Sequence, residues 1–152
     1  MKKRMYFLSI PLALVASVFL FSASKKVLSE EEKAIEAAIL DYVEGIYEMD
    51  TTRIYRSVHP ELEKRGYYFS DEKDRYSKKL EMSFEQLVDL TKGWNKNGQA
   101  GPDALKKIDI YTIHDKTASA KLTAYWGLDF MHLAKIDDKW MIMNVLWQTP
   151  PR

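Results

Sequence analysis

Two apolar runs near the C-terminus are separated by only two polar residues, Asp137 and Asp138. The runs, residues 130–136 and 139–147, have the composition of β-strands, and a two-residue connection is typical of a tight antiparallel hairpin. The spacing predicts a register that pairs Ile136 with Lys139, Ala134 with Met141, His132 with Met143, and Phe130 with Val145. A slip by one residue would turn every side chain to the other face of the sheet. Both faces are largely apolar, so we expect this hairpin to be covered on both sides.

Helical patterns come first along the chain and strand patterns follow. Ser29 and Glu32 form a capping box that opens a helix over about 30–49, and Asp50 can cap a short second helix that Pro60 ends. A second capping box, Ser83-x-x-Gln86, opens a helix that stops near Gly93. Between these helices, residues 61–82 predict only a short strand near 65–69 and a charged loop. Apolar residues then recur at every second position from Leu105 onward, which predicts strands over 108–113 and 118–126 before the hairpin. This order of elements predicts an α+β fold.

The alternation assigns side chains to two faces of the last sheet, if a two-residue turn lies at Gly127-Leu128. One face would be plain core: Leu122, Ala124, Met131, Leu133, Ile142, Asn144 and Leu146. The other mixes rings, Met and polar groups, as ligand pockets often do: Thr123, Tyr125, Phe130, His132, Met143, Val145 and Trp147.

The closing hairpin resembles that of the putative lumazine-binding family, within the nuclear-transport-factor-2-like superfamily. The matching residues are Leu133, Lys135, Ile136, Asp137, Trp140, Ile142 and Asn144. Asp138 stands where that family usually has a glycine, and residues 41–50 and His59-Pro60 resemble its first helix and the segment after it. The similarity covers about residues 30–149. It implies a cone-shaped domain, in which a curved antiparallel sheet packs on N-terminal helices and leaves a conical pocket.

The first 24 residues have the pattern of a secretory signal peptide. Lys2, Lys3 and Arg4 precede an uninterrupted non-ionic run over 5–21, and Ser22-Ala23-Ser24 offers small residues for cleavage. An uncleaved membrane anchor is the alternative, although the run is slightly shorter than the ~20 residues that usually span a bilayer. The expected domain then occupies residues 26–152, and we expect it in the periplasm or outside the cell. It is nearly neutral, without the basic footprint of a nucleic-acid-binding protein, and the chain has no Cys.

Motifs for phosphate loops, zinc proteases and serine or cysteine nucleophiles are missing from the sequence, and no metal site or cofactor is expected. The candidate pocket residues are Tyr42, Tyr47, His59, Tyr125, His132, Asn144 and Trp147. Each has a structural alternative: a tyrosine of the first helix can be core, His59 can close a helix, and Trp147 can cover the sheet or a partner. His132 is either an acid–base group or a sheet histidine. Asn144 either binds a ligand or bonds the backbone of a loop.

We therefore expect an exported protein that binds an unidentified small molecule or serves as an accessory protein. Because the hairpin is apolar on both faces, we also expect a homodimer through the sheet. Two alternatives stay open. One is an enzyme with its site in the cone, since the resemblance extends to ketosteroid isomerases and polyketide cyclases; the other is a structural partner of another envelope protein.

Overall fold

The computed structural model describes residues 28–151, so the predicted signal peptide lies outside the described residues. The described chain has three helices and eight strands. In order they are α1 (Glu30–Glu48), α2 (Thr51–Ser57), β1 (Val58–Tyr67), β2 (Phe69–Ser70), β3 (Arg75–Tyr76), β4 (Leu80–Met82), α3 (Phe84–Thr91), β5 (Lys106–Ile113), β6 (Thr117–Ala124), β7 (Gly127–Ile136) and β8 (Lys139–Gln148).

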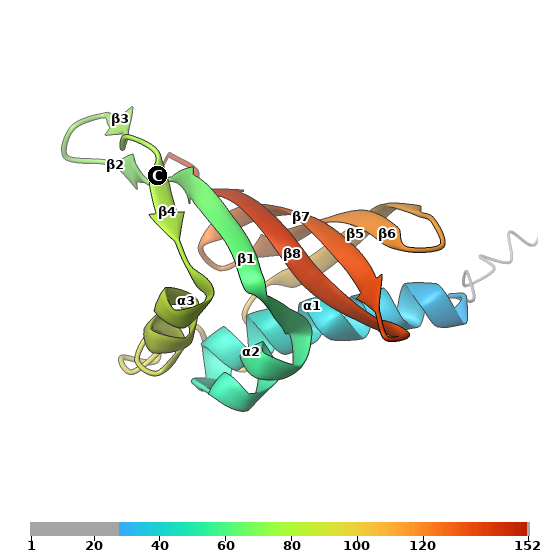
Figure 1. The fold of residues 1–152 in the computed structure, drawn as a ribbon. Coiled ribbons are helices and arrows are strands. Elements are labelled where there is room, and N and C mark those ends of the chain that lie inside the picture. The colour runs from blue at the N-terminus through green and yellow to red at the C-terminus, as the bar shows by residue number, and fades with distance from the viewer. Residues whose placement is uncertain (1–27, 152) are drawn as a thin grey trace, which may run out of the picture.

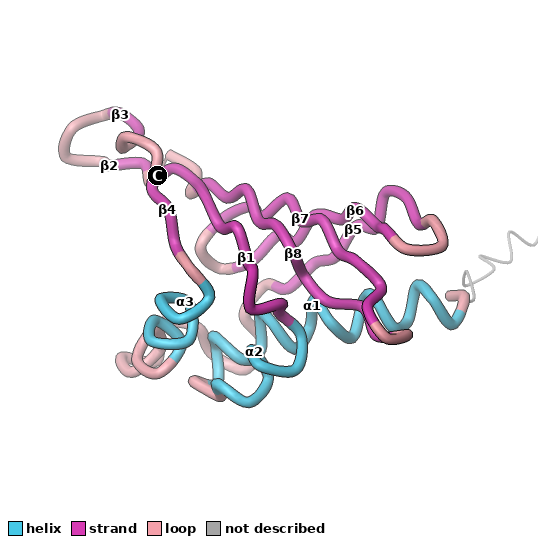
Figure 2. Tube along the Cα trace, viewed as in Figure 1, coloured by secondary structure: helices cyan, strands magenta, loops and turns pink. Residues whose placement is uncertain are grey.

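Six strands form one curved sheet in the order β4-β1-β8-β7-β6-β5, and β2 pairs with β3 in a small separate ribbon (Figure 1). The three helices lie on one side of this sheet, and the ribbon projects beyond its end (Figure 2). The α+β fold with N-terminal helices packed on a curved sheet is confirmed. The sheet is mixed rather than wholly antiparallel, because β1 runs parallel to β8 while the other neighbours are antiparallel.

The two capping boxes form as predicted. Ser29 accepts a hydrogen bond from the backbone N–H of Glu32, whose side chain in turn accepts from the N–H of Ser29. The same reciprocal pair joins Ser83 and Gln86 at the start of α3. The predicted helix over 30–49 is confirmed, since α1 ends at Glu48 and Met49 takes the left-handed conformation after it.

Helix α1 runs along the sheet from one end of its strands to the other. Near its start, Glu31 accepts hydrogen bonds from Lys135 and Trp140, on either side of the β7–β8 turn. Further along, Tyr42 reaches Asp129 at the start of β7, and Tyr47 reaches the backbone of Tyr125 in the β6–β7 turn. The buried residues between these points form one continuous core with the inner face of the sheet.

The closing hairpin contains a β-bulge that the predicted register lacked. The pairs Ile136 with Lys139 and Ala134 with Met141 are confirmed, but an irregularity follows at Met143, and His132 pairs with Asn144 instead. Because one extra residue reverses the alternation beyond it, the predicted faces were wrong for residues 144–147. Val145 is fully buried on the inner face, and Leu146 is exposed on the outer one.

The turn between β6 and β7 lies at Tyr125-Trp126, not at Gly127-Leu128 as predicted. The error shifts the pairing by an even number of residues, so it leaves the faces of β6 and β7 unchanged. It does change the neighbour of His132, which is Ser119 rather than Thr123. Of the long strand β1 only the end, at 65–67, was predicted, because its irregular start contains a proline and charged residues interrupt its apolar alternation.

Candidate functional site

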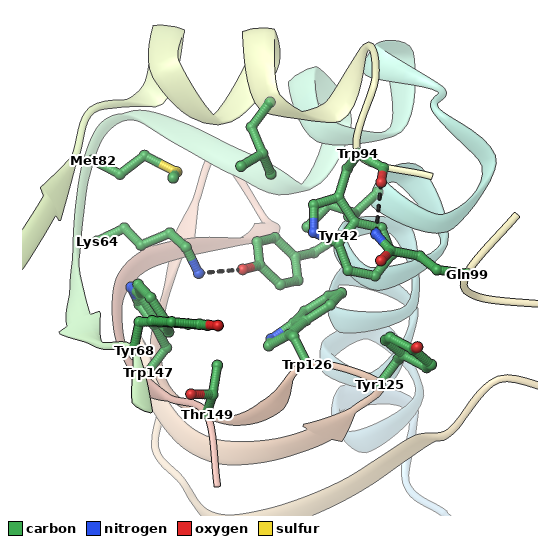
Figure 3. A pocket seen from close by; sticks show the side chains of 12 residues that line it. Tyr42, Lys64, Tyr68, Met82, Trp94, Gln99, Tyr125, Trp126, Trp147 and Thr149 are labelled. Carbon is green, nitrogen blue, oxygen red and sulfur yellow. Dashed lines mark hydrogen bonds between the residues drawn. The ribbon is translucent and has the colours of Figure 1, made fainter. Parts of the chain in front are cut away.

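A cavity of about 290 Å³ opens at the end of the sheet that carries the β6–β7 turn. This volume lies just below the range of typical ligand pockets, about 300–1,000 Å³. The lining is mainly aromatic and aliphatic, with one charged side chain (Figure 3). It consists of Tyr42, Ile46, Lys64, Tyr68, Met82, Leu90, Trp94, Gln99, Tyr125, Trp126, Trp147 and Thr149.

Elements from distant parts of the chain build this cavity. Helix α1 supplies Tyr42, β1 supplies Lys64, and β8 supplies Trp147, while the β6–β7 turn brings Tyr125 and Trp126. The positions on α1 and the strands are fixed by the core below them, so the rigid scaffold sets the geometry of one wall. The other wall comes from β4, α3 and the loop that follows α3.

Rings from both of these walls interlock in one cluster, which we call the aromatic wall. It consists of Tyr42, Trp94, Tyr125 and Trp126, with Tyr47 packed behind it. Trp126 meets the rings of Tyr42, Tyr47 and Trp94 edge to face, with centroids 6.2, 5.6 and 5.3 Å away. Trp94 stacks on Tyr47 at 5.8 Å and meets Tyr125 at 6.0 Å. Such pairs add stability beyond area burial alone, and they hold the rings facing the cavity in fixed orientations.

A buried carboxylate anchors this wall from behind. Asp129 is fully buried on the inner face of β7, where its two oxygens accept hydrogen bonds from the hydroxyl of Tyr42 and the indole N–H of Trp126, both at 2.9 Å. The ammonium of Lys64 donates to the Tyr42 hydroxyl at 2.7 Å and lies 3.7 Å from an oxygen of Asp129. A buried charge needs partners of this kind to offset its desolvation.

Burial sets the protonation of this network. Desolvation lowers the pKa of Lys64, and the nearby Asp129 carboxylate opposes that shift. Desolvation also raises the pKa of Tyr42 well above its ordinary value, and Asp129 adds to the effect because a tyrosinate there would face a second negative charge. The Tyr42 hydroxyl therefore keeps its proton. It donates a hydrogen bond to Asp129 and accepts one from Lys64.

Gly66 permits the position of Trp147. The two residues are partners in the parallel pair of β1 and β8, and a side chain at residue 66 would overlap the indole ring and the carbonyl oxygen of Trp147. The ring therefore lies directly on the backbone of β1, with the Lys64 ammonium 5.6 Å from its centroid. This is cation–π range.

The structure brings three of the predicted pocket residues to the cavity: Tyr42, Tyr125 and Trp147. Tyr47 lies behind the aromatic wall, where its hydroxyl donates to the carbonyl of Leu105 at 2.6 Å and accepts from the N–H of Tyr125 at 2.8 Å. Burial raises the pKa of Tyr47. It supports the wall rather than lining the cavity.

The other three predicted residues lie elsewhere. His132 is exposed on the outer face of the sheet, and Asn144 shares that face because of the bulge in β8. Asn144 donates to the carbonyl of Glu63 at 3.1 Å, which is the backbone-bonding alternative. His59 accepts from the N–H of Glu61 at 3.2 Å at the start of β1, away from the cavity. The predicted face that joined His132 to Trp147 was wrong, because the bulge in β8 turns Trp147 to the inner face while His132 stays on the outer one.

Sequence reasoning missed Lys64, Asp129 and Trp94 as members of the site. Asp129 did carry a signal, because it has the same parity as Met131 and Leu133 and is an acid on an otherwise apolar face. An acid at such a position requires a buried partner. Lys64 could be found only after β1 was recognised, since it then falls on the same face of the strand as the buried Leu62 and Gly66.

Within residues 28–151, no group of three or more potential ligand side chains is placed to hold a metal ion. None of the helices in the same range has the length and apolar character needed to cross a membrane.

Solved structures share the architecture of helices packed on one side of a curved sheet. A nuclear-transport-factor-2-like protein of unknown function from Silicibacter pomeroyi has a TM-score of 0.63 and 16% identity, over 82% of this chain and 100% of the other. One from Shewanella baltica has a TM-score of 0.58 and 19% identity, over 84% and 100%. A cystatin-like-fold protein from Nostoc punctiforme has a TM-score of 0.53 and 14% identity, over 83% and 96%. At these identities the likeness concerns the fold alone.

The sequence itself gives the family. Residues 30–148 match the family described as "Putative lumazine-binding", and the chain belongs to this family. The resemblance of the closing hairpin is thereby confirmed. Comparison with curated protein sequences gave no match.

Proposed function

We propose that this protein binds a small, flat molecule in the cavity between Trp147 and the Trp94–Trp126 wall. One observation supports this proposal above the others: a cavity of about 290 Å³ is lined by rings that lie in fixed orientations around it. The family name points in the same direction, because lumazine is a flat fused heterocycle. A ring stacked on an aromatic side chain gains about 1–3 kcal/mol, as measured for nucleic-acid bases.

Titration calorimetry with lumazine as the first probe tests this proposal. We expect saturable binding in wild type and a loss of about tenfold or more in Trp147→Ala, because the stacking surface is removed. His132→Gln is the matched control: it lies on the outer face, so the affinity should stay unchanged. A panel of flat bicyclic compounds that all fail to bind would count against the proposal, as would a Trp147→Ala variant that binds as well as wild type.

A catalytic role has one observation in its favour, the buried chain of Lys64, Tyr42 and Asp129 beside the cavity. Binding explains the same chain more simply. The Tyr42 proton already bonds Asp129, and Asp129 is enclosed behind Tyr42 and Trp126. A general acid or base must reach the proton that it transfers. Turnover of a bound compound that Asp129→Asn abolishes, with affinity kept, would favour the enzyme alternative.

Export is the second part of the proposal. The basic start, the apolar run over 5–21 and the small residues at 22–24 support it. The intact mass of protein from the envelope fraction should correspond to a chain that starts near Lys25. A full-length chain in the cytosol would contradict export, and a full-length chain in the membrane would favour the anchor.

The third part is a homodimer through the outer face of the sheet. Phe130 and Leu146 are paired on neighbouring strands of that face, and each is almost half exposed. A second copy of the chain would cover them. Light scattering should give about twice the chain mass for wild type and for Trp147→Ala, since Trp147 faces the cavity, and the single mass for Leu146→Glu. A wild-type monomer at micromolar concentration would contradict the dimer.

A further inference from the structure

Of the described side chains that line the cavity, Lys64 is the one with a formal charge. It is only 7% exposed, and its ammonium points inward from β1 toward Tyr42 (Figure 3). An ammonium carries three N–H bonds. Among the described residues, the Tyr42 hydroxyl accepts from it at 2.7 Å and the Asp129 carboxylate lies 3.7 Å away as its ion-pair partner, and the two lie on the same side of the nitrogen because they bond each other. A third N–H is therefore available to a molecule in the cavity.

The Lys64 ammonium lies near two of the rings that line the cavity. The nitrogen lies 5.6 Å from the ring centroid of Trp147 and 5.4 Å from that of Tyr42. An acceptor atom that bonds it would project from the edge of a ring that lies against Trp147. An acceptor attached directly to the flat ring system meets this geometry.

Charge balance narrows the choice of acceptor. Asp129 already compensates Lys64, and the other lining side chains carry no formal charge. The site is thus close to neutral, and a ligand carboxylate would add a second negative charge beside a buried one. A neutral acceptor avoids that cost, and hydrogen bonds to a charged donor are stronger than those between neutral groups.

We propose that Lys64 determines ligand specificity by donating a hydrogen bond to a ring carbonyl oxygen of an uncharged, flat heterocycle. The inference rests on the proposed function, because it names the chemical class that the same cavity selects. Burial supports it as well: an ammonium that has lost its water gains from any additional acceptor.

Two probes of nearly equal size and flatness test the proposal on the unmodified purified chain. Oxindole carries a ring carbonyl, whereas indole has only an N–H donor. We expect calorimetry to show oxindole binding about tenfold to a hundredfold more tightly than indole, and indole-2-carboxylate more weakly than oxindole. Equal affinities for oxindole and indole would overturn the role of Lys64 while leaving the proposed function intact. If neither these probes nor lumazine bind, both proposals fail.

Two variants locate the discrimination at Lys64. Lys64→Met combined with Asp129→Asn removes both charges together, so no carboxylate is left unpaired, and oxindole and indole should then bind alike. Asp129→Asn alone keeps the N–H donors of Lys64 and removes the carboxylate beside them, so the preference for oxindole should persist and indole-2-carboxylate should bind more tightly than it does to wild type. Lys92→Met, at an exposed lysine after α3, is the matched control and should keep the full preference. A double variant that folds and still prefers oxindole would refute the assignment. If the double variant fails to fold, the Asp129→Asn result and the wild-type probe pair still decide.

Discussion

The two ends of the inner sheet face differ in what covers them. At the aliphatic end, which we define by Ile35, Ile39, Leu133 and Ile142, every side chain is at most 2% exposed. At the aromatic end, defined by Tyr42, Lys64, Trp126, Asp129 and Trp147, rings and a charged pair surround a cavity. The same helix, α1, crosses both ends, so the helix alone does not account for the difference; the strands, the loop after α3 and the side chains that they bring do.

This comparison separates stability from binding within one layer of the fold. Aliphatic side chains interdigitate without directional requirements, so they close the sheet against α1 and hold it there. Rings and buried charges need specific partners, so their positions are fixed by those partners. Side chains held in this way do not close together, and a cavity is left between them. The aliphatic end therefore contributes mainly to the stability of the fold, and the aromatic end supplies the side chains that would contact a ligand. Substitutions that affect stability and affinity separately can test this division.

The largest expected effect is at the aliphatic end. Leu133→Ala removes a side chain that is 2% exposed, and we expect it to lower the free energy of unfolding by about 2–5 kcal/mol. Urea unfolding measures the loss, and the affinity of the folded variant for lumazine should match that of wild type. Leu105→Ala is the control, because Leu105 is 52% exposed and should cost far less. A large loss of affinity in folded Leu133→Ala would break the comparison.

A single methyl group at Gly66 should disturb the aromatic end from the backbone side. Gly66→Ala places a Cβ on the ring of Trp147, and overpacking of this kind costs about 1–3 kcal/mol. Because Trp147 must move, the tryptophan fluorescence and the ligand affinity should change together with the stability. Gly93→Ala is a matched control, since a Cβ there meets no atom within 4 Å. A Gly66→Ala variant with wild-type affinity would show that the ring position is not needed for binding.

The hydroxyl of Tyr42 links the charges of the aromatic end. Tyr42→Phe keeps the ring but removes the donor to Asp129 and the acceptor for Lys64, so we expect a loss of about 1–3 kcal/mol in unfolding free energy. Thermal and urea melts measure it. Tyr55→Phe, at a tyrosine that is 60% exposed, should melt like wild type. Equal stability of Tyr42→Phe and wild type would argue against a buried network in solution.

The aliphatic end was largely readable in the sequence, because its signals are local. Capping boxes and apolar spacing gave α1 and α3, and strict alternation gave the faces of β6 and β7. The alternation failed where one residue was added, at Met143, since a bulge leaves no mark in composition. That one residue moved Asn144 to the outer face and Trp147 to the cavity.

The aromatic end was only partly readable, because its partners are far apart in the chain. Tyr42 and Asp129 are 87 residues apart, and Lys64 lies on a strand whose parallel pairing with β8 has no local signature. Trp94 and Gln99 enter from a loop, where spacing carries no periodic signal. The sequence thus predicted that Met131 and Leu133 share one face of β7, but not that this face also carries Asp129 and holds the cavity.

The β7–β8 turn, beside the aliphatic end, offers a stabilising change. Asp137 and Asp138 both have positive φ, 47° and 59°, as a type I′ turn requires. A left-handed conformation costs a non-glycine residue roughly 1–2 kcal/mol, offset in part by the entropy that glycine loses on folding. Asp138→Gly should therefore raise the free energy of unfolding, measured by urea melts, by up to about 1 kcal/mol without changing ligand affinity. Lys139→Gly, in the adjoining strand, should lower it. A destabilised Asp138→Gly would mean that the aspartate contributes a contact that outweighs its backbone cost.

The smallest expected effect concerns the acid dependence of the aliphatic end. Glu31 accepts hydrogen bonds from Lys135 at 2.7 Å and Trp140 at 2.6 Å, and these bonds, the Lys135 one first, lower the pKa of Glu31 below its ordinary 4.5. A carboxyl with a lowered folded-state pKa stabilises the protein above its unfolded pKa, and this contribution disappears as the pH falls through the folded value. Wild type should therefore lose thermal stability more steeply than Glu31→Gln between about pH 5 and pH 3. Glu30→Gln, on the same helical turn but bonded only to the exposed Lys33 among the described residues, should follow the wild-type slope. Parallel slopes for wild type and Glu31→Gln would show that the start of α1 is held to the hairpin by apolar packing alone, which would sharpen the contrast with the charge-anchored aromatic end.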